Sequence, residues 1–74
     1  MINEKIKITK EKLDFYIGKR ILLHIVKNNG EWLNALVVSK ESENVYIIKE
    51  NKFGLMHLFV VDVSSIEEYR GDTG

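Results

Sequence analysis

The residues best suited to proton transfer or metal binding in this sequence are its two histidines, His24 and His57. Each stands inside an apolar run, "LLHIV" and "LMHLF", where a histidine is usually a structural residue of a strand. Ser64 and Ser65 have no histidine close by in sequence to act as a base. The chain also lacks a nucleophile elbow, a phosphate-binding glycine loop and metal-ligand spacing. We therefore predict that it is not an enzyme and that it holds no metal or cofactor.

The chain that must position any binding site is short, with 74 residues, and it contains no cysteine. A chain of this size buries only about 60% of its unfolded surface, so it often needs additional stabilisation. The composition excludes disulfides and thiolate metal sites, and self-association is the remaining support that we expect. No apolar run is long enough to span a membrane, and the first residues lack the apolar segment of a signal peptide. These features predict a cytoplasmic protein without membrane contact.

The charges are balanced overall but unevenly placed. Residues 1–30 hold seven Lys and Arg against three Asp and Glu, a net +4. Residues 31–74 hold four against eight, a net −4. A basic surface is the usual mark of a nucleic-acid binder. The excess in the first part of the chain indicates either an ordinary solvated surface or a module with one basic face.

One short helix is predicted near the N-terminus. Thr9 is a suitable N-cap, and Ile8 and Leu13 have the spacing of a hydrophobic staple around it. Gly18 is well placed as the glycine that follows a helix C-terminus. We therefore expect a helix over residues 10–17.

After Gly18 the apolar residues alternate with a period of two, and β-branched residues dominate, as in strands. Asn29-Gly30 suits a hairpin turn in which both residues take positive φ values. This pattern predicts a mostly β fold, with the short helix followed by a five-stranded, strongly bent antiparallel small barrel. The expected strands cover residues 19–27, 31–40, 45–50, 55–61 and 63–69, followed by a flexible tail at 70–74.

The fourth predicted strand, "LMHLFVVDV", is apolar on both faces. Alternation places Leu55, Phe59, Val61 and Val63 on one face and Met56, Leu58 and Val60 on the other. A small barrel buries only its inner face, so the helix or a second subunit must cover the outer one. The residues we expect at a contact between subunits are Leu55, Met56, Leu58, Val60 and Ile66.

Residues 20–48, "RILLHIVKNNGEWLNALVVSKESENVYII", resemble the first signature motif of the Sm/LSm family, which includes the bacterial RNA chaperone Hfq. Gly30 stands at the family's turn glycine, and Leu33 and Val37 stand at core positions of its long bent strand. Glu41 stands where the family prefers Asp, and Asn44 stands where it prefers Asn. The resemblance extends over about residues 10–69, nearly the whole chain.

The sequence also departs from the family pattern. Ala35 stands in place of the second glycine, and the turn "KESEN" is one residue shorter than the commonest Sm spacing. Ser42 stands where Sm proteins carry a base-stacking aromatic residue or histidine. The Arg-Gly of the second Sm motif and the Lys-His of Hfq are missing, and "VVDVSS" occupies that place. The sequence therefore matches the residues that specify the family's fold better than those that form its uridine-binding pocket.

The resemblance implies a homo-oligomeric ring of five to seven subunits, joined by pairing the fourth strand of one to the fifth of the next. It also implies binding of single-stranded RNA, with bases stacked on aromatic side chains and phosphates met by Lys and Arg. Two alternatives remain: a protein-interaction module without nucleic-acid binding, and an oligomer that binds a small ligand between subunits. The RNA-binding candidates are Asn44, Trp32, Lys10, Lys12, Lys19 and Arg20.

The family register gives the lone tryptophan a direction. If Leu33, Ala35 and Val37 face the core, then Trp32 faces outward. There it can pack under the N-terminal helix, join a contact between subunits or stack on a base.

Overall fold

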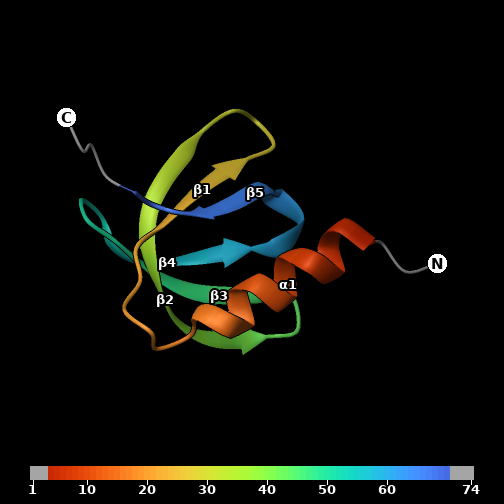
Figure 1. Cartoon of the computed structure of the whole chain (residues 1–74), viewed down its shortest axis with the longest axis horizontal. Coiled ribbons are helices and arrows are strands. Elements are labelled where there is room, and N and C mark those ends of the chain that lie inside the picture. Colours follow the sequence, from red (N-terminus) through yellow and green to blue (C-terminus); the bar gives the residue numbers. More distant parts are fainter. Residues whose placement is uncertain (1–3, 71–74) are drawn as a thin grey trace.

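The computed structural model describes residues 4–70, which form one helix, five strands and a short 3-10 turn. The helix, α1 (Glu4–Tyr16), precedes the whole sheet along the chain and lies against it (Figure 1). This confirms the predicted mostly β architecture with one N-terminal helix. The strands are β1 (Leu23–Lys27), β2 (Trp32–Ser42), β3 (Val45–Glu50), β4 (Gly54–Phe59) and β5 (Val63–Glu68), and η1 (Val60–Asp62) joins β4 to β5.

The five strands form one antiparallel sheet in the order β4-β3-β2-β1-β5. The central strand β2 pairs with β1 from Trp32 to Ala35 and with β3 from Ala35 onward. The register between β2 and β3 shifts twice, around Val38 and around Glu41, and bulges of this kind bend a strand. Figure 1 shows the consequence, because β2 curves through both halves of the sheet.

The sheet does not close into the predicted barrel, because β4 and β5 stand at its two edges and are not paired with each other. The chain between them forms η1 instead of a hairpin. The backbone of η1 bonds to two distant turns: the Val60 N–H donates to the Asn44 carbonyl at 2.9 Å, and the Asp62 carbonyl accepts from the Asn28 N–H at 2.8 Å. Within residues 4–70, each edge strand therefore has one side without a strand partner.

The core lies between the sheet and α1, which packs on β2, β5 and η1. Ala35 and Val37 are buried and Leu33 packs against the core, so the predicted register of β2 is confirmed. The buried apolar residues are Leu13 from α1, Leu23, Ile25, Ala35, Val37, Tyr46, Ile48, Leu58, Val60, Val63 and Ile66.

The predicted helix start was wrong, because α1 already begins at Glu4. Thr9 lies inside the helix and is buried, and its hydroxyl donates to the Lys5 carbonyl at 2.9 Å. A threonine can satisfy its hydroxyl in this way within a helix, so its cap signature did not mark an end. The predicted helix end is one residue late, because α1 ends at Tyr16; Gly18 follows it with a φ of +74°, as expected for a glycine after a helix C-terminus. No helix in residues 4–70 has the length and apolar character needed to cross a membrane.

The first hairpin differs from the predicted two-residue turn. Only Gly30 has a positive φ, at +90°, and Asn29 does not. The Gly30 N–H donates to the Lys27 carbonyl at 3.0 Å, and the Lys27 N–H donates to the Glu31 carbonyl at 2.7 Å. These bonds define a three-residue loop that ends in a left-handed glycine, a common alternative to the two-residue turn.

The strand boundaries match the prediction most closely at β3, which covers residues 45–50 as expected. β1 begins at Leu23 and not at 19, because the connection from α1 includes Arg20 with a positive φ of 59°. β4 ends at Phe59, two residues early, because the chain enters η1 there. Residues 71–74 of the predicted flexible tail lie outside the described residues.

The two faces of β4 are both apolar, as predicted, but most of the expected contact residues point inward. Leu58 and Val60 are each 1% exposed and Ile66 is 4% exposed, so they belong to the core of the chain itself. Met56 is half-buried against the same core, and only Leu55, at 67%, is well exposed. The 3-10 turn also changes the alternation, which is why Val63 is buried instead of sharing the face of Leu55. The exposed apolar residues of this edge are Leu55, Phe59 and Val61.

Candidate nucleic-acid interface

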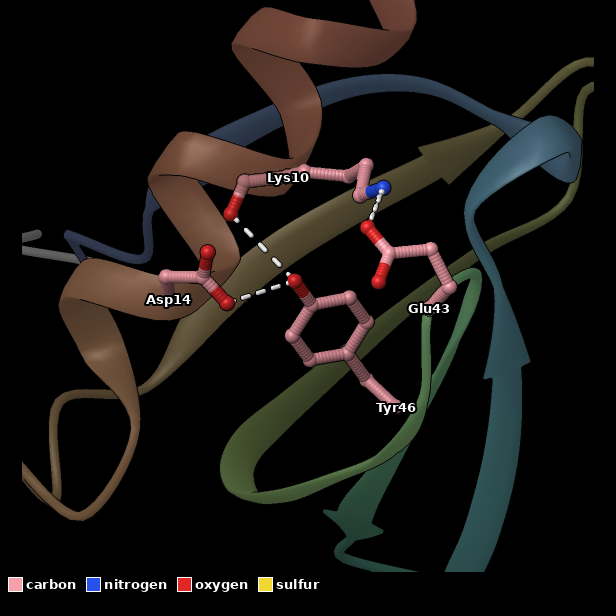
Figure 2. A network of polar contacts seen from close by, with 4 residues as sticks. All are labelled: Lys10, Asp14, Glu43 and Tyr46. Atoms are coloured by element: carbon pink, nitrogen blue, oxygen red, sulfur yellow. Dashed lines mark hydrogen bonds and ion pairs between the residues drawn. The ribbon is translucent and has the colours of Figure 1, made fainter.

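The structure brings two of the predicted RNA-binding residues together, Lys10 on α1 and Asn44 in the turn between β2 and β3. The Lys10 ammonium forms an ion pair with the Glu43 carboxylate, with Nζ and Oε1 2.7 Å apart (Figure 2). Asn44 follows directly, and its carbonyl accepts the Val60 N–H, which fixes the turn against η1. The Asn44 residue itself is exposed, so its side-chain amide is free to meet a ligand beside Lys10.

Tyr46 holds this part of the molecule together. It is fully buried, and its hydroxyl donates to Asp14 Oδ1 at 2.6 Å, with the Lys10 carbonyl 3.5 Å away (Figure 2). Burial, and then the hydrogen bond to Asp14, raise the pKa of Tyr46 far above its usual value. The phenol therefore stays protonated and serves as a structural link from β3 to α1, not as an acid or base.

A cavity of about 410 Å³ lies between α1 and this turn. Three lysines, Lys7, Lys10 and Lys40, line it. Lys10, through its hydrogen bond and charge, and then Lys40 hold the pKa of Glu43 below its usual range, so both ammonium groups act on this turn. The cavity is also lined by Ile6, Glu11, Asp14 and Glu43.

This arrangement can bind an anion but contains no catalytic set. Lysine ammonium groups contact phosphates as point charges, and an exposed amide can donate and accept hydrogen bonds. The acids beside the lysines balance their charge, so bound phosphate must displace Glu43 from Lys10. The Glu43 side chain is 77% exposed and the Lys10 side chain 20% exposed, so Glu43 is the partner that can move into solvent. No three His, Cys, Asp or Glu side chains within residues 4–70 gather as metal ligands.

The other predicted basic residues lie apart from this cavity. Lys12 donates to the Ile66 carbonyl of β5 at 3.3 Å. Lys19 places its ammonium 4.6 Å from the centre of the Phe15 ring. Arg20 lies in the connection to β1 and lines a separate hollow with Lys49. The six candidates therefore do not form one surface.

Trp32 is also separate, because it begins β2 and the Glu43 turn follows the other end of that strand. Its side chain is 62% exposed, so the predicted outward direction is confirmed and α1 does not cover it. Its ring lies 5.3 Å from the ring of His24 at an angle of 41°. His24 Nδ1 in turn lies 2.8 Å from Asn34 Oδ1, which holds the imidazole in place.

Three further exposed residues line these cavities and were not predicted from the sequence: Lys7, Lys40 and Phe53. Lys7 precedes Lys10 by three residues and shares its helix face, but the predicted helix began too late to include it. Lys40 lies on β2 and reaches the cavity only because β2 packs against α1, a contact that no local sequence pattern predicts. Phe53 had a signal of its own, since a large aromatic residue in the turn "NKFG" has no core position.

Comparison with known proteins adds no family to these observations: no protein-family model and no characterised protein matches this sequence. The chain is thus described by its fold, a small, bent, five-stranded antiparallel sheet with one N-terminal helix.

Replacing Tyr46 with Phe is expected to lower the free energy of unfolding by about 1–2 kcal/mol, because a partly buried hydrogen bond to a carboxylate is lost. Urea or thermal denaturation measures this change, and Tyr69→Phe on the exposed end of the chain is the control. The folded-state pKa of Tyr46 is raised, so its contribution is complete below an unfolded tyrosine pKa of about 10 and is lost as the pH rises above it. Tyr46→Phe should therefore flatten the alkaline loss of stability. Equal stability of the two proteins would contradict the role given to this hydroxyl.

Proposed function

We propose that this chain is an RNA-binding module that acts as a homo-oligomer, with single-stranded RNA as the ligand. The observation that carries the proposal is the set of three lysines, Lys7, Lys10 and Lys40, around one cavity beside the exposed Asn44. The lysines come from α1 and β2, and Tyr46 on β3, the strand paired with β2, bonds to Asp14 of α1.

In the proposed complex the RNA backbone follows the cavity between α1 and the turn after β2. The lysine ammonium groups replace counterions on the phosphates, so binding weakens as salt is added. Asn44 offers hydrogen bonds to a base edge or a 2′-hydroxyl. Each subunit supplies only a few contacts, and repetition around an oligomer raises the overall affinity.

The edges of the sheet support the proposed assembly. β4 and β5 each have one side without a strand partner within residues 4–70, and an antiparallel pair between β4 of one copy and β5 of the next would use both. The exposed side chains of Leu55, Phe59 and Val61 would be buried at this contact. Lys12 bonds a β5 carbonyl at 3.3 Å, a weak contact that a neighbouring strand can replace. An Sm-like ring of five to seven copies is the assembly that we propose.

Fluorescence anisotropy of end-labelled oligo-A and oligo-U tests the proposal. We expect saturable binding of at least one strand in about 50 mM salt, which is below physiological ionic strength, and a steady loss of affinity as salt increases. An unchanged anisotropy with both strands at low salt would overturn RNA binding.

A second candidate, a protein-interaction module without nucleic-acid binding, is favoured by one observation. Leu55 is 67% exposed, Phe59 50% and Val61 57%, which is an unusual amount of exposed apolar side chain on one edge of the sheet. Affinity purification that recovers a stoichiometric protein partner and no RNA would favour this candidate over the first.

A further inference from the structure

A second cavity, of about 430 Å³, lies between the β1–β2 hairpin and the turn that joins β3 to β4. It is at the opposite end of β2 from the lysine cavity, so it is a different site. Its apolar walls include two aromatic side chains that are well exposed, Trp32 at 62% and Phe53 at 76%. Leu33 and Met56 form its half-buried floor.

Both aromatic walls stand on fixed parts of the backbone. Trp32 is the first residue of β2, pairs with Val26 across the hairpin and lies against the His24 ring. Phe53 is held through its turn, because Glu50 Oε1 accepts the Phe53 N–H at 2.9 Å and the Lys52 N–H at 2.6 Å. The backbone that carries each ring is therefore held in place, so a ligand that contacts both rings needs to order mainly their side chains.

The charges around this cavity select the ligand. Two carboxylates, Glu31 and Glu50, line it against one ammonium, Lys27. Within residues 4–70 the Glu31 carboxylate has no hydrogen bond or ion pair, so its charge is available to a ligand. Aromatic faces attract cations, and excess carboxylate repels phosphate. The cavity therefore disfavours a nucleic-acid backbone and favours a positive group.

We propose that this cavity binds a small organic cation that carries an N-alkylated ammonium group. Such a group is weakly hydrated and presents its charge over a large apolar surface, which suits two aromatic faces better than a primary ammonium does. Trp32 and Phe53 would contact the alkyl groups, and Glu31 would supply the opposite charge at the rim. This binding is independent of the proposed RNA binding, which uses the other cavity.

Trp32 is the only tryptophan of the chain, so its fluorescence reports directly on the occupancy of this cavity. Choline chloride is the probe, and 3,3-dimethyl-1-butanol has the same shape without the charge. Sodium chloride at equal concentration controls for ionic strength. We expect choline to change the emission in a saturable way and the neutral alcohol to bind roughly five- to thirtyfold more weakly. A peptide that contains trimethyllysine is titrated in the same way. If it binds more tightly than choline, the N-alkylated ammonium group that the cavity recognises belongs to a polypeptide.

Two variants sharpen the test. Phe53→Ala is expected to abolish the choline response, and Glu31→Gln to reduce the preference for choline over the alcohol. Phe15→Ala, an exposed aromatic residue of α1, should leave both unchanged. Circular dichroism confirms that each variant is folded. Equal affinity for choline and the alcohol, or no saturable response to choline, would overturn the proposal. A response to adenosine monophosphate without one to choline would also overturn it and make this cavity a base-binding site.

Discussion

Replacing both Leu55 and Phe59 with Glu is expected to convert the proposed oligomer to a monomer of 8.6 kDa. Both side chains are at least half exposed on the outer face of the edge strand β4, so the subunit itself loses no core contact. Burying one large apolar side chain at an interface contributes about 1.5–3 kcal/mol, and two charges in its place add desolvation cost. Each contact between subunits should therefore weaken by more than about 100-fold. Size-exclusion chromatography with light scattering measures the mass.

The matched control replaces Phe15 and Val38 with Glu. These residues are also about half exposed and apolar, but they lie on α1 and on the central strand β2, not on an edge strand of the sheet. We expect this control to keep the mass of the unmodified oligomer. If the β4 variant also keeps that mass, the contact between subunits does not involve the outer face of β4.

Replacing Lys7, Lys10 and Lys40 with Gln is expected to weaken RNA binding by roughly tenfold to a hundredfold at low salt. The three ammonium groups surround one cavity, and Gln keeps the length of the side chain while it removes the charge. Each phosphate contact on a single strand contributes about 0.7 to the slope of log affinity against log salt, so this slope should fall by about 2. Anisotropy titrations at several salt concentrations give both quantities.

The control for this variant removes the same charge elsewhere. Lys19, Lys49 and Lys52 are exposed and lie outside the lysine cavity. Their replacement with Gln should change the affinity only slightly. An equal loss in both variants would show that RNA responds to total charge and not to this cavity.

The local features of the fold could be predicted from the sequence because they depend on short-range physics. The alternation in residues 45–50 gave the third strand its bounds, and Gly18 marked the end of the helix. The inward direction of Ala35 and Val37 followed from a period of two. Each of these features is decided by neighbours in the chain.

The errors arose where contacts between distant residues decided the outcome. Thr9 has a cap signature, but contacts with the sheet keep it inside a longer helix, where it is buried. Alternation alone placed Val63 on the same face as Leu55, but η1 changed the phase of the strand, so Val63 is buried and Leu55 is exposed. The unpaired edges of β4 and β5 could not be foreseen, because an apolar pattern does not say which strands pair.

The candidate site was predicted in part. Lys10 and Asn44 were named from the sequence; Lys10 lines the cavity, and Asn44 follows Glu43, which pairs with Lys10 there. Trp32 was assigned to the same activity, yet it lies at the other end of β2 beside Phe53. Side chains 30 or more residues apart, such as Lys10 and Glu43, meet only through the packing of α1 on the sheet, which no local pattern encodes.

The most direct test of RNA binding by an assembled form is the mass of the protein measured together with the RNA it carries. Light scattering with absorbance at two wavelengths, applied to the protein mixed with a single-stranded oligonucleotide in low salt, gives both values in one run. We expect a single species whose protein mass is a multiple of 8.6 kDa and which carries the RNA. A protein that elutes as an 8.6 kDa monomer, separate from the RNA, would contradict RNA binding by an assembled form.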